Sequence, residues 1–156
     1  MGNLIAMSCK RRHVQLQELG QVVSQLEFDI DFMGTPLGEA LNRISARYTD
    51  GIGDVLKYVC CCMKDERCVD MSDIWKSAFD RFKNELSLKE EDISIILEFS
   101  KKLGCGNREY EKTNLKGTSV RLKVAEDEAA EISRTNVKMY RGLGILAGIF
   151  IVIVLI

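Results

Sequence analysis

The sequence predicts an all-α protein: an antiparallel helical bundle with long first and last helices, the last continuing into a C-terminal transmembrane helix. Three observations predict this. Apolar residues recur at alternating spacings of three and four, which is typical of helices that pack through one face. No segment shows the period-two alternation of a half-buried strand. All 22 Lys and Arg and all 23 Asp and Glu precede Gly142, and the last 15 residues are apolar or glycine.

The average composition hides this division. The chain has 156 residues, a net charge of −1 and a mean hydropathy of −0.04, as an ordinary soluble domain would. This charge balance excludes proteins that bind nucleic acid through a basic surplus. Three of the six cysteines are consecutive, Cys60–Cys62. Because consecutive helical residues point about 100° apart, they do not suit a regular disulfide framework, and we expect free thiols in a reducing compartment.

The chain divides into three segments. Residues 1–9 are a short apolar segment that could be the remnant of a membrane helix. Residues 137–156 are the predicted transmembrane helix, since about 20 helical residues span the ~30 Å hydrocarbon core. Residues 10–136 are predicted to be a cytoplasmic helical bundle, because basic residues flank both of its ends and cytoplasmic segments carry such an excess. The flanking residues are Lys10, Arg11, Arg12, Arg134, Lys138 and Arg141.

The first long helix is predicted from an apolar seam with spacings of three and four. The seam consists of Leu16, Leu19, Val23, Leu26, Ile30 and Met33, and Phe28 and Phe32 widen it. A sharp corner follows at residues 33–36. We expect Gly34 to take the left-handed conformation, Thr35 to cap the next helix and Pro36 to lie in its first turn.

Four shorter helices are expected before the last one. The second presents Leu37, Ala40, Leu41, Ile44 and Tyr48, and the third presents Val55, Leu56, Val59, Cys60 and Met63 before a charged run at 64–67. Asp70 or Ser72 is expected to cap the fourth, whose core side is Ile74, Trp75, Ala78, Phe79 and Phe82. Ser87 and Glu90 have the spacing of a capping box for the fifth, which is expected to end at Gly104.

The last helix begins near Asn107 and is expected to run without a break into the membrane segment. Its seam is Leu115, Thr118, Leu122, Ala125, Ala129, Ile132, Asn136, Met139, Leu143 and Leu146. A lone polar residue on such a seam, here Asn136, can fix helix register. Gly144 and Gly148 form a small-xxx-small pair that would let another membrane helix approach closely. The alternative, that glycines are simply common in membrane helices, stays open.

No catalytic or metal-binding pattern stands out. His13 is the single histidine, no C-x-x-C pair is present, and no nucleophile–base motif occurs. The acidic run Glu90, Glu91 and Asp92 has a simpler explanation, since negative charge complements a helix N-terminus. The sequence therefore predicts a protein that is not an enzyme, with no cofactor, no small-molecule substrate and no nucleic-acid partner.

Several segments together resemble the stage III sporulation protein AB family. The corner Gly34-Thr35-Pro36-Leu37, followed by Glu39-Ala40-Leu41, is similar to a signature of that family. Further similar segments follow in the family's order: Trp75, residues 98–104, residues 126–130 and residues 138–144 before the apolar tail. The resemblance covers roughly residues 14–156.

The resemblance implies a cell-membrane protein of endospore-forming bacteria, in the channel-like complex between mother cell and forespore. Its helical domain would face the mother-cell cytoplasm and resemble the platform proteins of type II secretion and type IV pilus systems. Its implied partners are the lipid bilayer and other stage III sporulation proteins, including the secretion-type ATPase, stage III sporulation protein AA. Family members usually begin with a full membrane helix, and here only Leu4 to Met7 stands in its place, so one and two spans both stay open.

Two surfaces are predicted to dock a partner. One is the corner with Thr35, Pro36, Leu37 and Glu39, and the other is the acidic helix start with Glu90 and Glu91. The alternative function is a tail-anchored coiled-coil tethering or fusion protein, because a heptad helix leading into a terminal anchor is the layout of such proteins. Gly117 and Asn136 interrupt a strong zipper and count against this alternative.

Overall fold

The structure is a computed structural model that describes residues 2–64, 70–103 and 108–155. Within these ranges every regular element is a helix, which confirms the predicted all-α class. The elements are α1 (Gly2–Asp31), α2 (Leu37–Ser45), α3 (Gly51–Met63), α4 (Met71–Arg81), the 3-10 helix η1 (Lys83–Glu85), α5 (Glu90–Lys101) and α6 (Arg108–Leu155). The predicted charged run beyond residue 64, the helix end at Gly104 and the helix start at Asn107 lie outside the described residues.

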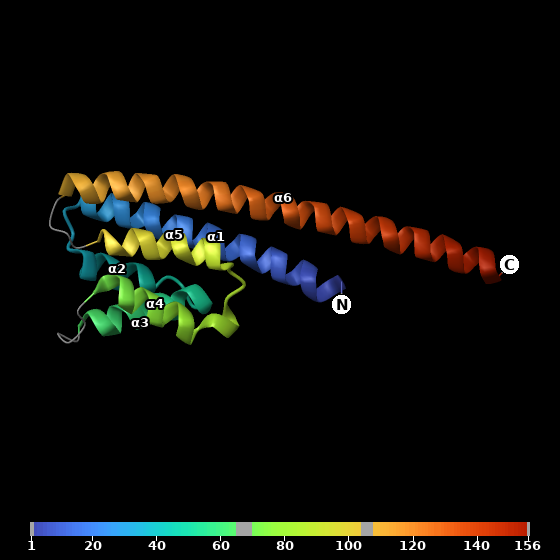
Figure 1. Ribbon diagram of the computed structural model, residues 1–156, viewed down its shortest axis with the longest axis horizontal. Helices are drawn as coiled ribbons and strands as arrows, with labels where there is room; N and C mark the ends of the chain where they lie inside the picture. Colours follow the sequence, from blue (N-terminus) through green and yellow to red (C-terminus); the bar gives the residue numbers. More distant parts are fainter. Residues whose placement is uncertain (1, 65–69, 104–107, 156) are drawn as a thin grey trace.

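The two long helices lie side by side and run in opposite directions (Figure 1). The α1–α6 contact is the most extensive between any two elements, and α2 to α5 pack together along one side of this pair. Each α-helix reverses the direction of the one before it, which short connections between neighbouring helices favour. At the end opposite the α1–α2 corner, α6 extends well beyond the N-terminus of α1 (Figure 1).

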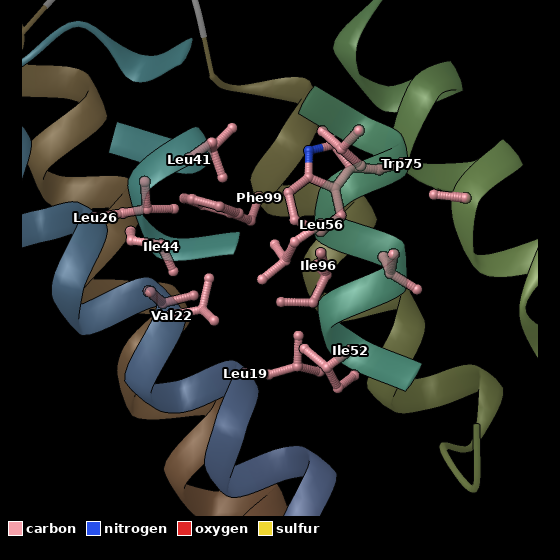
Figure 2. Close-up of a cluster of buried hydrophobic side chains, with 14 of the residues drawn as sticks. Leu19, Val22, Leu26, Leu41, Ile44, Ile52, Leu56, Trp75, Ile96 and Phe99 are labelled. Carbon is pink, nitrogen blue, oxygen red and sulfur yellow. The ribbon is translucent and has the colours of Figure 1, made fainter. Parts of the chain in front are cut away.

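The core forms where α1 meets α2, α3, α4 and α5. Figure 2 shows side chains from all five helices converging, among them Leu26 of α1, Trp75 of α4 and Phe99 of α5. The predicted seam of α1 is buried from Leu16 to Ile30. The seam of α6 is buried at Leu115, Thr118, Leu122, Ala125 and Ala129. Trp75 and Phe79 are buried as expected, and Phe82 is half-buried.

The distal end of the α1 seam differs from the prediction. Met33, Phe28 and Phe32 were expected to extend the packed face, and all three are exposed. Helix α1 ends at Asp31, so Phe32 and Met33 lie in the corner beyond its last turn. Phe28 is half-exposed because it lines an open groove with Gln21 and Gln25 of α1, where α2 and α6 do not close over it.

The corner after α1 has one predicted feature and two different ones. Gly34 has a φ of 63°, the left-handed conformation that glycine adopts without a steric penalty. Thr35 does not cap α2: its backbone N–H donates to the carbonyl of Asp29 at 2.9 Å and so satisfies a terminal carbonyl of α1. Pro36 is the residue before the first turn of α2, which begins at Leu37.

The predicted cap of α4 is confirmed, and the predicted cap of α5 is wrong. Asp70 caps α4, accepting from the backbone N–H of Ser72 at 3.0 Å. The predicted capping box of Ser87 and Glu90 is wrong, because α5 begins at Glu90 itself. Asp92 fills that role by accepting from the backbone N–H of Lys89 at 2.9 Å.

The predicted C-terminal transmembrane helix over 137–156 is wrong. Among the residues that the structure describes, no helix combines the length and the apolar character needed to cross a membrane. The described part of α6 without charged residues is 142–155, whose 14 residues measure ~21 Å, short of a hydrocarbon core of ~30 Å. Extending it toward the N-terminus brings in Arg141 and Lys138. The prediction of one unbroken last helix is confirmed, since α6 runs from Arg108 to Leu155.

Candidate partner-docking surfaces

A buried ion pair holds α1 against α5. Arg12 Nε and Nη2 each donate to a carboxylate oxygen of Asp92 at 2.7 Å, and both side chains are buried. The hydrogen bond to Asp92 raises the pKa of Arg12. Asp92 also caps α5, so one carboxylate serves both the helix start and the contact between helices. Arg12, which the sequence counted with the basic flank, is therefore neutralised inside the bundle and is not an exposed charge.

A second set of charges fixes the other end of α1. Asp29, itself buried, pairs with Arg43 of α2 at 2.7 Å and accepts a hydrogen bond from Gln25 at 3.2 Å. Asp31 pairs with Lys112 of α6 at 3.2 Å. The end of α1 is thus tied to α2 and to α6, which gives the corner a defined position.

The predicted docking residues of the corner lie on the surface. Pro36 and Glu39 are exposed, and Thr35 and Leu37 are half-buried. They adjoin three exposed apolar residues, Phe28, Phe32 and Met33, which we call the distal patch. The Phe28 and Phe32 rings stack with centroids 5.5 Å apart, and 77% of Phe32 is exposed.

The distal patch is a candidate interaction site, because large apolar groups that cluster on a surface mark such sites more often than scattered ones do. Aromatic residues and Met are also enriched in protein interfaces. The sequence placed these side chains on the packed face because Met33 continues the seam and Phe28 and Phe32 were expected to widen it. The neighbouring Gln21, Ser24 and Gln25, on the same side of α1 as Phe28, were the available sign that this side is polar and uncovered.

Glu90 and Glu91 lie at the opposite end of the bundle from the corner. Their helix start is joined to Arg12 through Asp92, and Arg12 precedes Asp31 by 19 positions, or ~28 Å of helix. The structure therefore does not bring the two predicted docking surfaces together. Glu90 lines a groove of about 310 Å³ between α4 and α5, whose floor includes Phe79, Leu88 and Leu97.

The end of α6 is a third surface. From Leu143 to Leu155 its large apolar side chains are exposed on all sides of the helix. A methyl group added at Gly144 or Gly148 would have no atom within 4 Å, so no part of the described chain uses the close approach these glycines allow. A helix that is apolar on all sides is ordinarily buried, which makes this exposed end a candidate interaction surface.

Asn136 lies between the packed and the exposed parts of α6. It is half-buried, and its Nδ2 is 3.6 Å from the sulfur of Cys9 on α1. This contact joins the two long helices at the seam position where the sequence predicted a register-setting residue. Cys60 is buried in α3, and burial raises the pKa of its thiol, which keeps it protonated and unreactive.

Some of the residues that hold the site together were missed from the sequence. Arg12 and Asp92 were each assigned a surface role, because a charged residue is almost never buried without a partner and the partner is 80 positions away. The available signal was the place of Asp92 as the third residue of a helix, where a carboxylate can accept from the residue before that helix. In the part of the chain that the structure describes, no three His, Cys, Asp or Glu side chains group as metal ligands would.

Comparisons with known proteins agree with this architecture. A family model described as stage III sporulation protein AB matches residues 1–156. Stage III sporulation protein AB of Bacillus subtilis (strain 168) is 23% identical over 141 residues, which cover 90% of this chain and 82% of that protein. A solved structure of a stage III sporulation protein AB has the same fold, with a TM-score of 0.72 at 19% identity over 80% of this chain and 97% of that chain. Because the family model matches along the whole length, the chain belongs to the stage III sporulation protein AB family.

Proposed function

We propose that this chain is a non-enzymatic assembly component of the stage III sporulation complex between mother cell and forespore. We propose further that its bundle docks the secretion-type ATPase of that complex from the mother-cell side. Family membership supports the assignment to the complex. The observation that carries the docking role is the distal patch, where the stacked Phe28 and Phe32 are exposed beside the predicted docking corner.

The position of the distal patch supports this use. It lies at the end of the bundle far from the exposed end of α6, so one molecule can hold a partner at each end (Figure 1). The charges around it, with Asp29 paired to Arg43 and Asp31 paired to Lys112, hold the corner in place before a partner arrives. A rigid surface of this kind loses little conformational entropy on binding.

The end of α6 has a separate proposed role. Gly144 and Gly148 would let an apolar helix of another component, or lipid of the nearby bilayer, contact this end closely. The alternative function, a coiled-coil tether, needs a free apolar seam on α6. The seam from Leu115 to Ala129 is buried within this chain, which argues against a tether.

Affinity measurements with the purified ATPase, stage III sporulation protein AA, test the docking role. We expect the full chain to bind and Phe32→Ser to weaken binding at least ~10-fold, as loss of an interface hot spot does. Val120→Ser is the matched control, because Val120 is 64% exposed on α6 outside the distal patch. Glu39→Lys tests the adjoining corner and Glu90→Lys tests the groove between α4 and α5. No binding by the wild type, or equal loss with Phe32→Ser and Val120→Ser, would show the proposal to be wrong.

A further inference from the structure

A basic pocket lies between α1 and α6 at the end of their packed region. Lys10 and His13 of α1 face Arg134 and Lys138 of α6 across a pocket of about 660 Å³. Lys138 precedes the charge-free end of α6, which starts at Gly142, by one helical turn. The pocket therefore lies directly beside the exposed apolar surface, on the part of the chain that carries the last charges.

The charges of this pocket are not balanced within the described residues. Lys123, also on its wall, pairs with Glu126 at 3.1 Å and with Asp127 at 3.3 Å, and this accounts for both carboxylates that line it. Among the described residues, no carboxylate lies within ion-pair distance of Lys10, Arg134 or Lys138. Three cations held around one pocket repel each other, and an anion between them would relieve that repulsion.

The basic side chains suit a phosphate group. Arg134 can donate through its planar guanidinium, which matches the geometry of a phosphate. Lys10 and Lys138 add point charges beside it. The Nδ1 atom of His13 is buried away from solvent and takes no part in this arrangement.

We propose that this pocket binds the phosphodiester headgroup of an anionic phospholipid. The neighbouring apolar surface decides between a lipid and a free phosphate ion. A lipid places its phosphate among Lys10, Arg134 and Lys138 and its acyl chains along the exposed side chains that begin at Leu143. A free phosphate would use the charges and leave the apolar surface uncovered. This inference does not depend on ATPase docking, which uses the other end of the bundle.

Vesicle flotation with the full chain tests the proposal. The measured quantity is the ratio of affinities for vesicles with 30% phosphatidylglycerol and for vesicles of phosphatidylcholine alone, because this ratio cancels the general attraction of the apolar end. We expect the Arg134→Gln, Lys138→Gln double variant to lower the ratio by about 25-fold, since a basic residue near an anionic surface contributes roughly a factor of five. We expect the single variants Arg134→Gln and Lys138→Gln each to lower the ratio by about fivefold.

The matched control is the Lys76→Gln, Lys83→Gln double variant, which removes the same charge from the α4–η1 side. It should leave the ratio unchanged, and circular dichroism checks that all variants keep their helices. Equal losses in both double variants would mean diffuse attraction and would overturn the proposal. A wild-type ratio near one would also overturn the proposal. Displacement by millimolar inorganic phosphate would assign the pocket to a free anion, and displacement by a poly-glutamate peptide would assign it to an acidic protein segment. Either displacement would overturn the lipid assignment.

Discussion

Two parts of α6 share one continuous helix and have opposite surroundings. In the packed part, Leu115 and Leu122 face α1 and are no more than 1% exposed. In the exposed part, Leu146 is 66% exposed and the remaining apolar side chains are similar. The difference comes from neighbouring elements and not from residue type, since leucines lie in both parts. The packed part therefore stabilises the fold, and the exposed part buries none of its large apolar side chains among the described residues.

The largest expected effect is at the border of the packed region, where the buried pair of Arg12 and Asp92 closes the bundle. Replacing Arg12 by Met leaves the Asp92 carboxylate buried without its partner, which costs about 3–5 kcal/mol. Guanidinium titration, followed by circular dichroism, measures the change in the free energy of unfolding. The control is Arg121→Met: Arg121 also pairs with a carboxylate, that of Glu98, but both side chains are half-exposed. Such exposed pairs contribute little to stability because water screens them, and an equal cost for both variants would contradict the assignment.

The comparison between the packed and the exposed parts of α6 predicts the second-largest effect on the free energy of unfolding. Leu122→Ala should lower the free energy of unfolding by about 2–5 kcal/mol, because it leaves a cavity against α1. Leu146→Ala should change it by less than ~0.5 kcal/mol, because that side chain is already exposed. The denaturation midpoints of the two variants, compared with that of the wild type, measure these changes in stability. A large effect of Leu146→Ala on the isolated chain would mean that the exposed end packs against its own bundle.

Two glycines provide a smaller test. A methyl group at Gly53 would lie 2.3 Å from the carbonyl oxygen of Tyr48, so Gly53→Ala forces the start of α3 to move and should cost about 1–3 kcal/mol. Gly148→Ala meets no atom within 4 Å and should raise helix stability by up to ~1 kcal/mol. Thermal melts measure both changes. If the glycine pair on α6 packs against another helix, Gly148→Ala should also weaken that association, and unchanged association would remove this role.

The smallest expected effect is a pH dependence of the free energy of unfolding that comes from Glu18 in the packed region. Burial, helped by the nearby Asp50, raises the pKa of Glu18 above its ordinary value of 4.5. The folded state then holds this proton more tightly than the unfolded state, so stability is lost as pH rises from about 4.5 through the raised value. Glu18→Gln should remove this loss in melts between pH 4 and pH 7.

Glu98 is the control of opposite sign. The hydrogen bond from Arg121 lowers the pKa of Glu98, so its contribution is present above 4.5 and is lost as pH falls through the lowered value. Glu98→Gln should therefore flatten the acid side of the profile. If both variants changed the profile in the same direction, burial would not be the cause of the Glu18 effect.

Helix periodicity correctly predicted the α-helical class, the long first and last helices, and most of the buried residues. The seam from Leu16 to Ile30 and the caps at Gly34 and Asp70 followed from local spacing and turn chemistry. These features depend on residues within one or two turns of each other, which is why the sequence reveals them. The capping box at Ser87 failed because Ser87 N–H donates to Gln15 of α1 at 2.7 Å, a contact 72 positions away.

The docking surfaces also combine features that local sequence reveals with features that depend on distant contacts. Local sequence marked the corner and the acidic start of α5 as candidates, but not that they lie at opposite ends of the bundle. The distal patch was also hidden, since Phe28 and Phe32 were expected to widen the packed face of α1. The meeting of Lys10 with Arg134 and Lys138 followed from the expected antiparallel pairing of the first and last helices, but the pocket between them did not.

The uncharged stretch after Arg141 can be read directly from the residues, and so can the amphipathic helices before it. Which apolar side chains are covered depended on where the helices end and which neighbours they meet. Burial is a property of two surfaces, and a single helix contains only one of them. For that reason the tertiary structure alone decided that Phe32 is surface and that Arg12 lies inside the bundle with Asp92.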